Sequence, residues 1–465
     1  MRLIGGNISD TPVKEIGDGS AFSVGGAAGS PALVEIGTVP AAGSALTNID
    51  HAVRGNMGNG QVYNNSGTVK WSDNSFGIFW IAKASPFELF YCHVQTNADG
   101  TFASEGSVVD LSGDSVGGGS GMGFAMATID VKKISASRVI VSVFRLDSTY
   151  GAEDLVYDLN GDTLTEHGSV FDHGASGWND SASGSCKWVA LKDADHGVSF
   201  WTDSSGQTTF HGTPVHVTTS KTAGTTVART CSYKESSGGL AFTDNTGQIW
   251  TICAQSSPGA NTLHEWTVST GATPSVAVSA GYSGWQRIIG AALGSSGPVQ
   301  SDGGFDGGGG LGAALICRND IERGRFITLA NFPQVGVFGG ATTNNSFMFP
   351  VGLMGVNGTH WGDFNDNSKI VEFSYDDATY WGRYAVVSVR NSNDIFFTPF
   401  NFNWSTYSYV LSNVDDLPNA TTDVTIRRQD VWAVLKGSDS ATNLCVIFQE
   451  DTTSDIRYLN VPFTV

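Results

Sequence analysis

One arrangement of residues recurs along this chain and limits what it can fold into. An apolar segment ends in a single basic residue, a polar turn follows, and a second apolar segment comes next. The runs "KWVALKDADHGVSFWTDSSGQ" and "RTCSYKESSGGLAFTDNTGQ" contain this unit twice in succession. The basic residues are Lys83, Arg145, Lys192, Lys234, Arg318, Arg390 and Lys436. Self-similarity of this kind predicts one supersecondary unit that is repeated several times.

The spacing of the repeat indicates how the units assemble. From Lys83 to Lys436 the basic residues are on average about 59 residues apart, which is room for three or four short strands per unit. We therefore predict an all-β fold, a β-propeller of about seven blades built from short antiparallel strands. Each basic residue and its turn are expected to form the hairpin in the middle of a blade. The 84-residue interval from Lys234 to Arg318 leaves six to eight blades open.

Composition agrees with many short strands joined by tight turns. The 465 residues include 59 glycines, charged residues are only 15 %, and 40 % of the residues are hydrophobic. No long Ala-, Glu-, Lys- and Leu-rich tract suggests a helix, and the apolar content is sufficient for a core. We expect very little helix.

The first 65 residues differ from the rest. The run "GSAFSVGGAAGSPALVEIGTVPAAGSALTNID" is rich in Ala, Gly and Ser and nearly free of aromatic residues. Two roles fit a segment with so little core of its own: an arm that docks on a partner, or strands that close the ring against the last blade. We predict an N-terminal arm over residues 1–65 and a propeller over residues 66–465.

Charge and composition also exclude several classes of function. With 25 basic and 44 acidic residues the formal net charge is −19, which disfavours a nucleic-acid partner. The N-terminus has no apolar region of a secretory signal, and no apolar run is long enough to insert into a membrane. The six cysteines form no CxxC pair, and the nine histidines do not cluster. We expect reduced, buried cysteines, no metal and no cofactor.

Two motifs suggest an enzyme and a third suggests a calcium site, and each lacks a second required feature. "GDSVGG" at 113–118 matches the run around a serine protease nucleophile, but no upstream His has the matching setting. The Thr-Asp turns resemble sialidase Asp boxes, which mark the fold rather than the active site. "DFNDNS" at 363–368 lacks the Gly and Glu of a calcium loop. We predict no catalysis, while a glycosidase using two or three carboxylates stays open.

Aromatic, acidic and basic residues are densest in "HWGDFNDNSKIVEFSYDDATYWGRY", residues 360–384. Sugars stack their C–H faces on Trp or Tyr, and carboxylates accept hydrogen bonds from their hydroxyl groups. Candidate glycan contacts are Trp361, Asp363, Asp376, Asp377, Tyr380, Trp381 and Arg383. The alternative is that these aromatic residues only cover the faces of blades.

The repeat as a whole resembles tail-associated β-propeller proteins of bacteriophages, particularly marine ones. The resemblance is carried by strand–basic–turn–strand runs such as "VALKDADHGVSFWTDSSG" and "GLAFTDNTGQIWTI". It implies a virion structural protein of the tail tip, nozzle or fibre, with a role in host attachment. The partners it implies are other tail proteins, further copies of this chain, and a host-surface glycan or protein. The alternative is a carbohydrate-binding or glycoside-hydrolysing propeller outside any virion.

Overall fold

The computed structural model describes residues 22–24, 29–38, 44–46, 66–81, 89–111, 129–144, 152–168, 171–173, 187–202, 209–217, 222–230, 239–243, 249–253, 262–271, 273–278, 313–317, 326–330, 337–338, 346–350, 368–376, 378–379, 381–390, 394–403, 409–411, 419–421, 432–437, 441–450, 453 and 455–465. Every regular element in these ranges is a β-strand, which confirms the all-β class. None of these ranges contains a helix of the length and apolarity that spanning a membrane requires.

The described strands form seven sheets, numbered here along the chain. The first contains β4 (Ser66–Ser72), β5 (Ser75–Ile81), β6 (Leu89–Thr96), β7 (Phe102–Glu105) and β8 (Val109–Asp110). The second contains β9 (Ile129–Ser135), β10 (Arg138–Phe144), β11 (Ala152–Asn160), β12 (Thr163–Glu166) and β13 (Phe171–Asp172). The third contains β14 (Lys187–Leu191), β15 (His196–Thr202), β16 (Thr209–His216), β17 (Thr222–Ala223) and β18 (Val227–Thr230). The fourth contains β19 (Gly239–Thr243), β20 (Ile249–Cys253), β21 (Thr262–Val268) and β22 (Val276–Val278).

The remaining three sheets are less uniform. The fifth contains β23 (Ala313–Cys317), β24 (Phe326–Ala330), β25 (Val337–Phe338) and β26 (Ser346–Pro350), and its pair β24–β26 is parallel. The sixth contains β27 (Ser368–Tyr375), β28 (Trp381–Arg390), β29 (Asp394–Asn403), β30 (Tyr409–Leu411) and β31 (Asn419–Thr421), with β1 (Phe22–Val24) at its edge. The seventh contains β32 (Trp432–Lys436), β33 (Asn443–Gln449) and β34 (Ile456–Thr464), with β2 (Glu35–Ile36) and β3 (Ser44–Ala45) beside β34.

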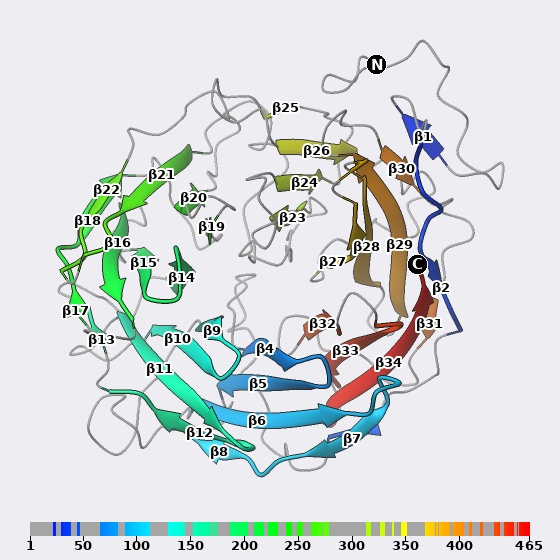
Figure 1. The fold of residues 1–465 in the computed structure, drawn as a ribbon, viewed down its shortest axis with the longest axis horizontal. Coiled ribbons are helices and arrows are strands. Elements are labelled where there is room, and N and C mark those ends of the chain that lie inside the picture. Colours follow the sequence, from blue (N-terminus) through cyan, green and yellow to red (C-terminus); the bar gives the residue numbers. More distant parts are fainter. Residues whose placement is uncertain are drawn as a thin grey trace.

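The sheets stand around a common centre, with the first strand of each innermost (Figure 1). Five of them, the first to fourth and the sixth, contain four consecutive antiparallel strands, the form of a propeller blade. Innermost strands contact those of neighbouring sheets: β4 contacts β9 and β32, β14 contacts β9 and β19, and β27 contacts β23 and β32. The propeller arrangement is therefore confirmed, whereas the number of blades is taken up below as a proposal.

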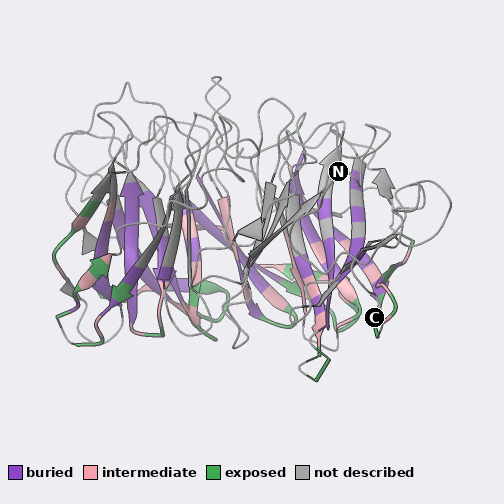
Figure 2. Cartoon of the chain, turned by 90° about the horizontal axis from the view of Figure 1, so that it is seen from above, coloured by how far each residue is buried: buried purple, intermediate pink, exposed green. Residues whose placement is uncertain are grey.

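The hydrophobic core lies between sheets rather than at one centre. Strand β5 shows why: Ile78 and Trp80 pack against the seventh sheet, while Phe79 and Ile81 pack against the second. Successive side chains of a strand point to opposite faces, and here both faces are covered by a neighbour. This is why the segment "FGIFWI" is continuously apolar instead of alternating. Figure 2 shows buried residues along the strands and the exposed described residues mostly along one edge of the ring.

The described parts of the first 65 residues lie against the propeller's own outer strands. β1 pairs with β30, and β2 and β3 both pair with the C-terminal strand β34. The amide of Asn401 on β29 donates to the carbonyl of Pro31 (2.7 Å) and to the Ser30 hydroxyl (3.1 Å). Segments from the two ends of the chain therefore share the seventh sheet.

The repeated basic residues do not occupy one equivalent position. Arg390 ends β28, the second strand of the sixth sheet, as expected for the middle hairpin, and Lys83 and Arg145 come in the sequence between the second and third strands of their sheets. Lys192 instead follows β14 and Lys436 ends β32, each the first strand of its sheet, so the expectation is wrong for these two; Arg318 comes in the sequence directly after the first strand β23. The physical reason is that both hairpins begin with a buried strand reaching the surface, which gives them the same local pattern. Lys83, Arg145, Lys234 and Arg318 themselves lie outside the described residues.

Candidate functional site

The structure describes three of the seven candidate glycan contacts. Asp376 accepts hydrogen bonds from the Ala378 N–H (2.9 Å) and the Thr379 hydroxyl (2.6 Å), in the turn between β27 and β28. The Thr379 hydroxyl, followed by the Ala378 N–H, lowers the pKa of the Asp376 carboxyl. Trp381 is buried, and Arg383 is half-buried on β28. Asp376 and Trp381 therefore have structural roles in a hairpin.

The other four candidates, Trp361, Asp363, Asp377 and Tyr380, lie outside the described residues. So do "GDSVGG" and all of "DFNDNS" except Ser368. Among the residues that are described, no three His, Cys, Asp or Glu side chains are grouped as metal ligands would be.

A cavity of about 130 Å³ lies where the first and seventh sheets meet. Its walls come from the turns β4–β5, β6–β7 and β32–β33 and from the strands next to them. Hydroxyl and amide side chains line it, together with two lysines, one aspartate and two aromatic rings. These are Ser72, Ser75, Thr96, Thr442, Asn74, Asn443, Lys70, Lys436, Asp73, Phe76 and Tyr458.

The charged groups of the cavity are paired with one another or with the backbone. Lys70 Nζ lies 3.1 Å from Asp73 Oδ1 and also donates to the carbonyl of Gly437, across the junction. Lys436 Nζ donates to the carbonyl of Phe373 on β27 of the sixth sheet. Both ammonium groups are thereby held in place by the fold.

The aromatic part of the wall joins the two ends of the chain. The rings of Phe76 (β5) and Tyr458 (β34) are nearly parallel, at 9°, with centroids 6.1 Å apart. The Tyr458 hydroxyl donates to the carbonyl of Gly100, and burial raises the pKa of this phenol. Gly100 has φ +80°, and a Cβ there would lie 2.5 Å from the Cβ of Asn443. Only glycine suits this close approach of the β6–β7 turn to β33.

The turns around the cavity are internally hydrogen-bonded. The hydroxyl groups of Ser72 and Ser75 are 2.9 Å apart, and Ser72 Oγ accepts from the N–H of Asn74 (3.3 Å). In the β6–β7 turn, Asp99 accepts from the N–H (3.0 Å) and hydroxyl (2.6 Å) of Thr101. Polar turn residues thus hold the wall in a defined shape.

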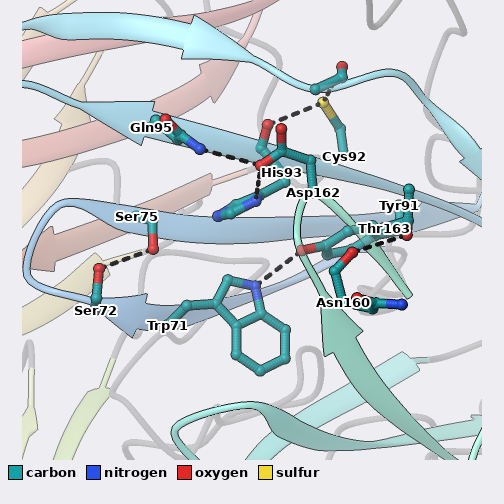
Figure 3. A network of polar contacts seen from close by, with 11 residues as sticks. Trp71, Ser72, Ser75, Tyr91, Cys92, His93, Gln95, Asn160, Asp162 and Thr163 are labelled. Carbon is teal, nitrogen blue, oxygen red and sulfur yellow. Dashed lines mark hydrogen bonds and ion pairs between the residues drawn. The ribbon is translucent and has the colours of Figure 1, made fainter. Parts of the chain in front are cut away.

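A second polar network lies on the other side of the first sheet, against the second (Figure 3). His93 Nδ1 lies 2.8 Å from Asp162 Oδ1, which also accepts from Gln95 Nε2 at 3.0 Å. Beneath them, Trp71 Nε1 donates to the Tyr91 hydroxyl at 2.9 Å. This network fastens the β11–β12 turn onto β6, and none of these five residues lines the cavity.

Burial raises the pKa of the neighbouring Cys92 thiol to about 12, so it stays protonated at neutral pH and is not a nucleophile. Burial also raises the pKa of the Cys445 thiol, on the cavity wall, well above the usual value for a thiol. Both cysteines are free, as the sequence predicts for this pair.

Sequence reasoning did not find the cavity. Its walls come from residues 70–100 and 435–458, at opposite ends of the repeat region. The local signals, "WSDNS" and "KGSDSATN", are ordinary turn compositions that occur along the whole chain. Only the meeting of the first and seventh sheets distinguishes these turns from the others.

Comparison with known proteins gives weak likenesses. No family model matches the chain, and no curated protein matches it. A bifunctional GH43-CE protein of Bacteroides eggerthii shares 10 % identity over 71 % of this chain, with a TM-score of 0.30. This chain spans only 32 % of that protein.

Two further solved structures match over more of their length. A subtype N11 neuraminidase-like protein from A/flat-faced bat/Peru shares 11 % identity over 92 % of this chain and 97 % of its own, with a TM-score of 0.33. The tail fiber of Staphylococcus aureus phage P68 shares 8 % identity over 92 % of this chain and 93 % of its own, with a TM-score of 0.17. With scores this low, the assignment of a propeller depends on the sheets themselves.

Proposed function

We propose that this chain is a recognition protein that holds a polar ligand in the cavity between its first and seventh sheets. The observation that carries the proposal is the lining of that cavity, in which hydroxyl and amide side chains converge from two sheets on one partly open cavity. Concave sites with a few convergent polar groups are the usual form of a small-ligand site. The hydrogen-bonded turns supply the rigidity that recognition needs.

Binding without cleavage suits this cavity. Hydrolysis of a glycosidic bond requires two carboxyl groups, about 5–10 Å apart, on either side of the bond. Asp73 is the only acidic residue among those that line the cavity, and Lys70 already pairs with it. The cavity can therefore hold a sugar or a similar ligand but lacks the second carboxyl group for this chemistry.

We further propose that the protein is a multi-copy virion component of a bacteriophage tail, at the tip, nozzle or fibre, and contacts the host surface. The strand–basic–turn–strand repeat supports this, together with the arrangement of the sheets around a common centre. In this proposal all seven sheets are blades, the seventh being completed by β2 and β3. Other tail proteins and a surface glycan or protein of the host are its partners.

The test uses the full chain, fluorescently labelled, incubated with whole cells from a panel of marine bacteria. Saturable attachment to some strains and not others is expected, with no loss of envelope carbohydrate over time. Uniform absence of attachment would contradict the recognition role. Release of sugars from the cells by the purified protein would contradict binding without cleavage.

A further inference from the structure

The cavity's chemistry is specific enough to name a class of ligand. We propose that it binds a single neutral sugar residue, and that the bound sugar bridges the first and seventh sheets. The inference rests on the proposed function only in taking this cavity as the ligand site; it does not depend on the virion.

The charges around the cavity favour a neutral ligand. Lys70 and Asp73 form a pair at 3.1 Å, and Lys436 is turned toward the carbonyl of Phe373 in the sixth sheet. A charged group on the ligand would have to compete with these existing partners for Lys70, Asp73 or Lys436, and the net charge of −19 also repels anions.

The uncharged side chains suit a sugar in particular. Each sugar hydroxyl both donates and accepts a hydrogen bond, as do the hydroxyl and amide groups of Thr96, Thr442, Asn74 and Asn443. Phe76 and Tyr458 form an apolar part of the wall, but both rings are packed in the core between the two sheets, so the hydrogen-bonding groups carry the recognition. A partly open cavity of about 130 Å³ is too small to enclose more than one sugar ring.

A ligand in this cavity touches both ends of the repeat region. Ser72, Asn74 and Thr96 belong to the first sheet, whereas Thr442 and Asn443 belong to the seventh. Such a ligand binds only when the two sheets are together, so it must also stabilise the closed ring. At a ligand concentration about ten times Kd, linkage predicts a stabilisation of about 1.4 kcal/mol, which is a tenfold shift in the unfolding equilibrium.

The experiment measures binding and stability on the same full-length samples. The probes are glucose, galactose, mannose and N-acetylglucosamine, with glucuronate and glucosamine as charged counterparts, studied by saturation-transfer NMR and thermal unfolding. At least one neutral sugar should bind and raise Tm, while the charged sugars bind at least tenfold more weakly. Preferential binding of a charged sugar, or no binding by any probe, would overturn the proposal.

Two variants locate the site. Asn443→Ala removes a cavity amide from a half-buried position and should lower the affinity for the neutral sugar at least tenfold with little change in the Tm of the free protein. Thr163→Ala removes an exposed hydroxyl that bonds to the Asn160 carbonyl at 3.0 Å, away from the cavity, and should leave binding unchanged. Equal binding by Asn443→Ala and the parent protein would place the sugar elsewhere.

The outcomes separate this inference from the proposed function. A protein that attaches to bacterial cells but binds no neutral sugar here would retain its recognition role and lose this site. A protein that binds the sugar in the cavity but attaches to no cells would retain the site and lose the proposed host contact.

Discussion

At Arg138 and Asp158, two charged side chains lie directly opposite each other on paired strands β10 and β11. Arg138 Nε and Nη2 donate to the two carboxylate oxygens of Asp158 at 2.6 and 3.0 Å, and His167 Nδ1 lies 2.7 Å from Oδ2. The hydrogen bond from Arg138 is the main reason why the pKa of Asp158 is lowered. Two-point geometry of this kind makes a partly exposed ion pair stronger than most.

Replacing Asp158 by Asn should lower the free energy of unfolding by about 0.5–1 kcal/mol at neutral pH. A carboxyl group with a lowered folded-state pKa contributes stability above its unfolded pKa of about 3.9, and loses it as the pH falls through the folded value. The difference between the parent protein and Asp158→Asn should therefore begin to shrink near pH 4 and continue to shrink as the pH falls through the lowered folded-state pKa. Urea unfolding between pH 7 and pH 3 measures this difference in the free energy of unfolding.

The control is Ser135→Ala, in the neighbouring hairpin. It removes no titrating group, so its difference in stability from the parent protein should not depend on pH. The same pH-independence in Asp158→Asn would contradict the assignment.

Between elements, lysine side chains of one sheet donate hydrogen bonds to backbone carbonyls of a neighbouring sheet. Lys133 Nζ on β9 donates to the carbonyl of Trp71 on β4 at 2.9 Å, and Lys192 Nζ donates to the carbonyl of Val268 on β21 at 2.8 Å. Lys70 makes the same kind of bond from the first sheet to the seventh, and Lys436 makes it from the seventh sheet to the sixth. Two of these four, Lys192 and Lys436, are basic residues of the sequence repeat. At these two positions the repeated basic residue therefore marks the end of a strand and also bonds to the neighbouring sheet.

Replacing Lys133 by Met removes the bond to Trp71 while it retains most of the aliphatic chain. We expect a loss of about 0.5–1.5 kcal/mol in the free energy of unfolding, the net worth of one hydrogen bond. The adjacent Lys132 pairs at 3.2 Å with Asp130 on its own strand, so Lys132→Met is a matched control that should cost less. Chemical denaturation of the three proteins measures the difference. A larger loss in Lys132→Met would show that the bond between sheets is not the stabilising contact.

Over the whole molecule, the N-terminal residues contribute buried surface to the last sheets. Val34 and Ile36 pack in the core between the sixth and seventh sheets, and Leu46 packs in the core between the seventh and first. The N–H of Leu46 donates to the carbonyl of Ile456 at 2.8 Å. Burying each of these side chains contributes about 1.5–3 kcal/mol. These residues are thus part of the propeller in addition to any role in attachment to a partner.

A chain that begins at residue 66 should therefore be destabilised by several kcal/mol, and Leu46→Ala in the full chain by about 2–5 kcal/mol. Glu35→Ala, at an exposed position of β2, should change stability little. Thermal unfolding of the four proteins gives the ranking. If the shortened chain were as stable as the full one, the N-terminal residues would be free to serve only as a docking arm.

The sequence by itself determined the local features of this fold. Thr202 and Thr209 end and begin two paired strands, as do Thr243 and Ile249, so both Thr-Asp…Gly-Gln runs join antiparallel neighbours. The continuous apolar run of β5 required both faces to be buried. Such features depend on residues a few positions apart, because the strand period is two and turn residues act locally.

Only the tertiary structure decided which turns meet. Lys70 bonds to Gly437, Tyr458 bonds to Gly100, and β2 pairs with β34, although hundreds of residues separate each pair in sequence. The cavity is formed by contacts between these distant segments, and no local sequence pattern marks its residues. The same applies to Trp381, whose sequence context is typical of a sugar site while its position at the start of β28 buries it. Packing between distant strands, rather than residue type, determines whether an aromatic or polar side chain is available to a ligand.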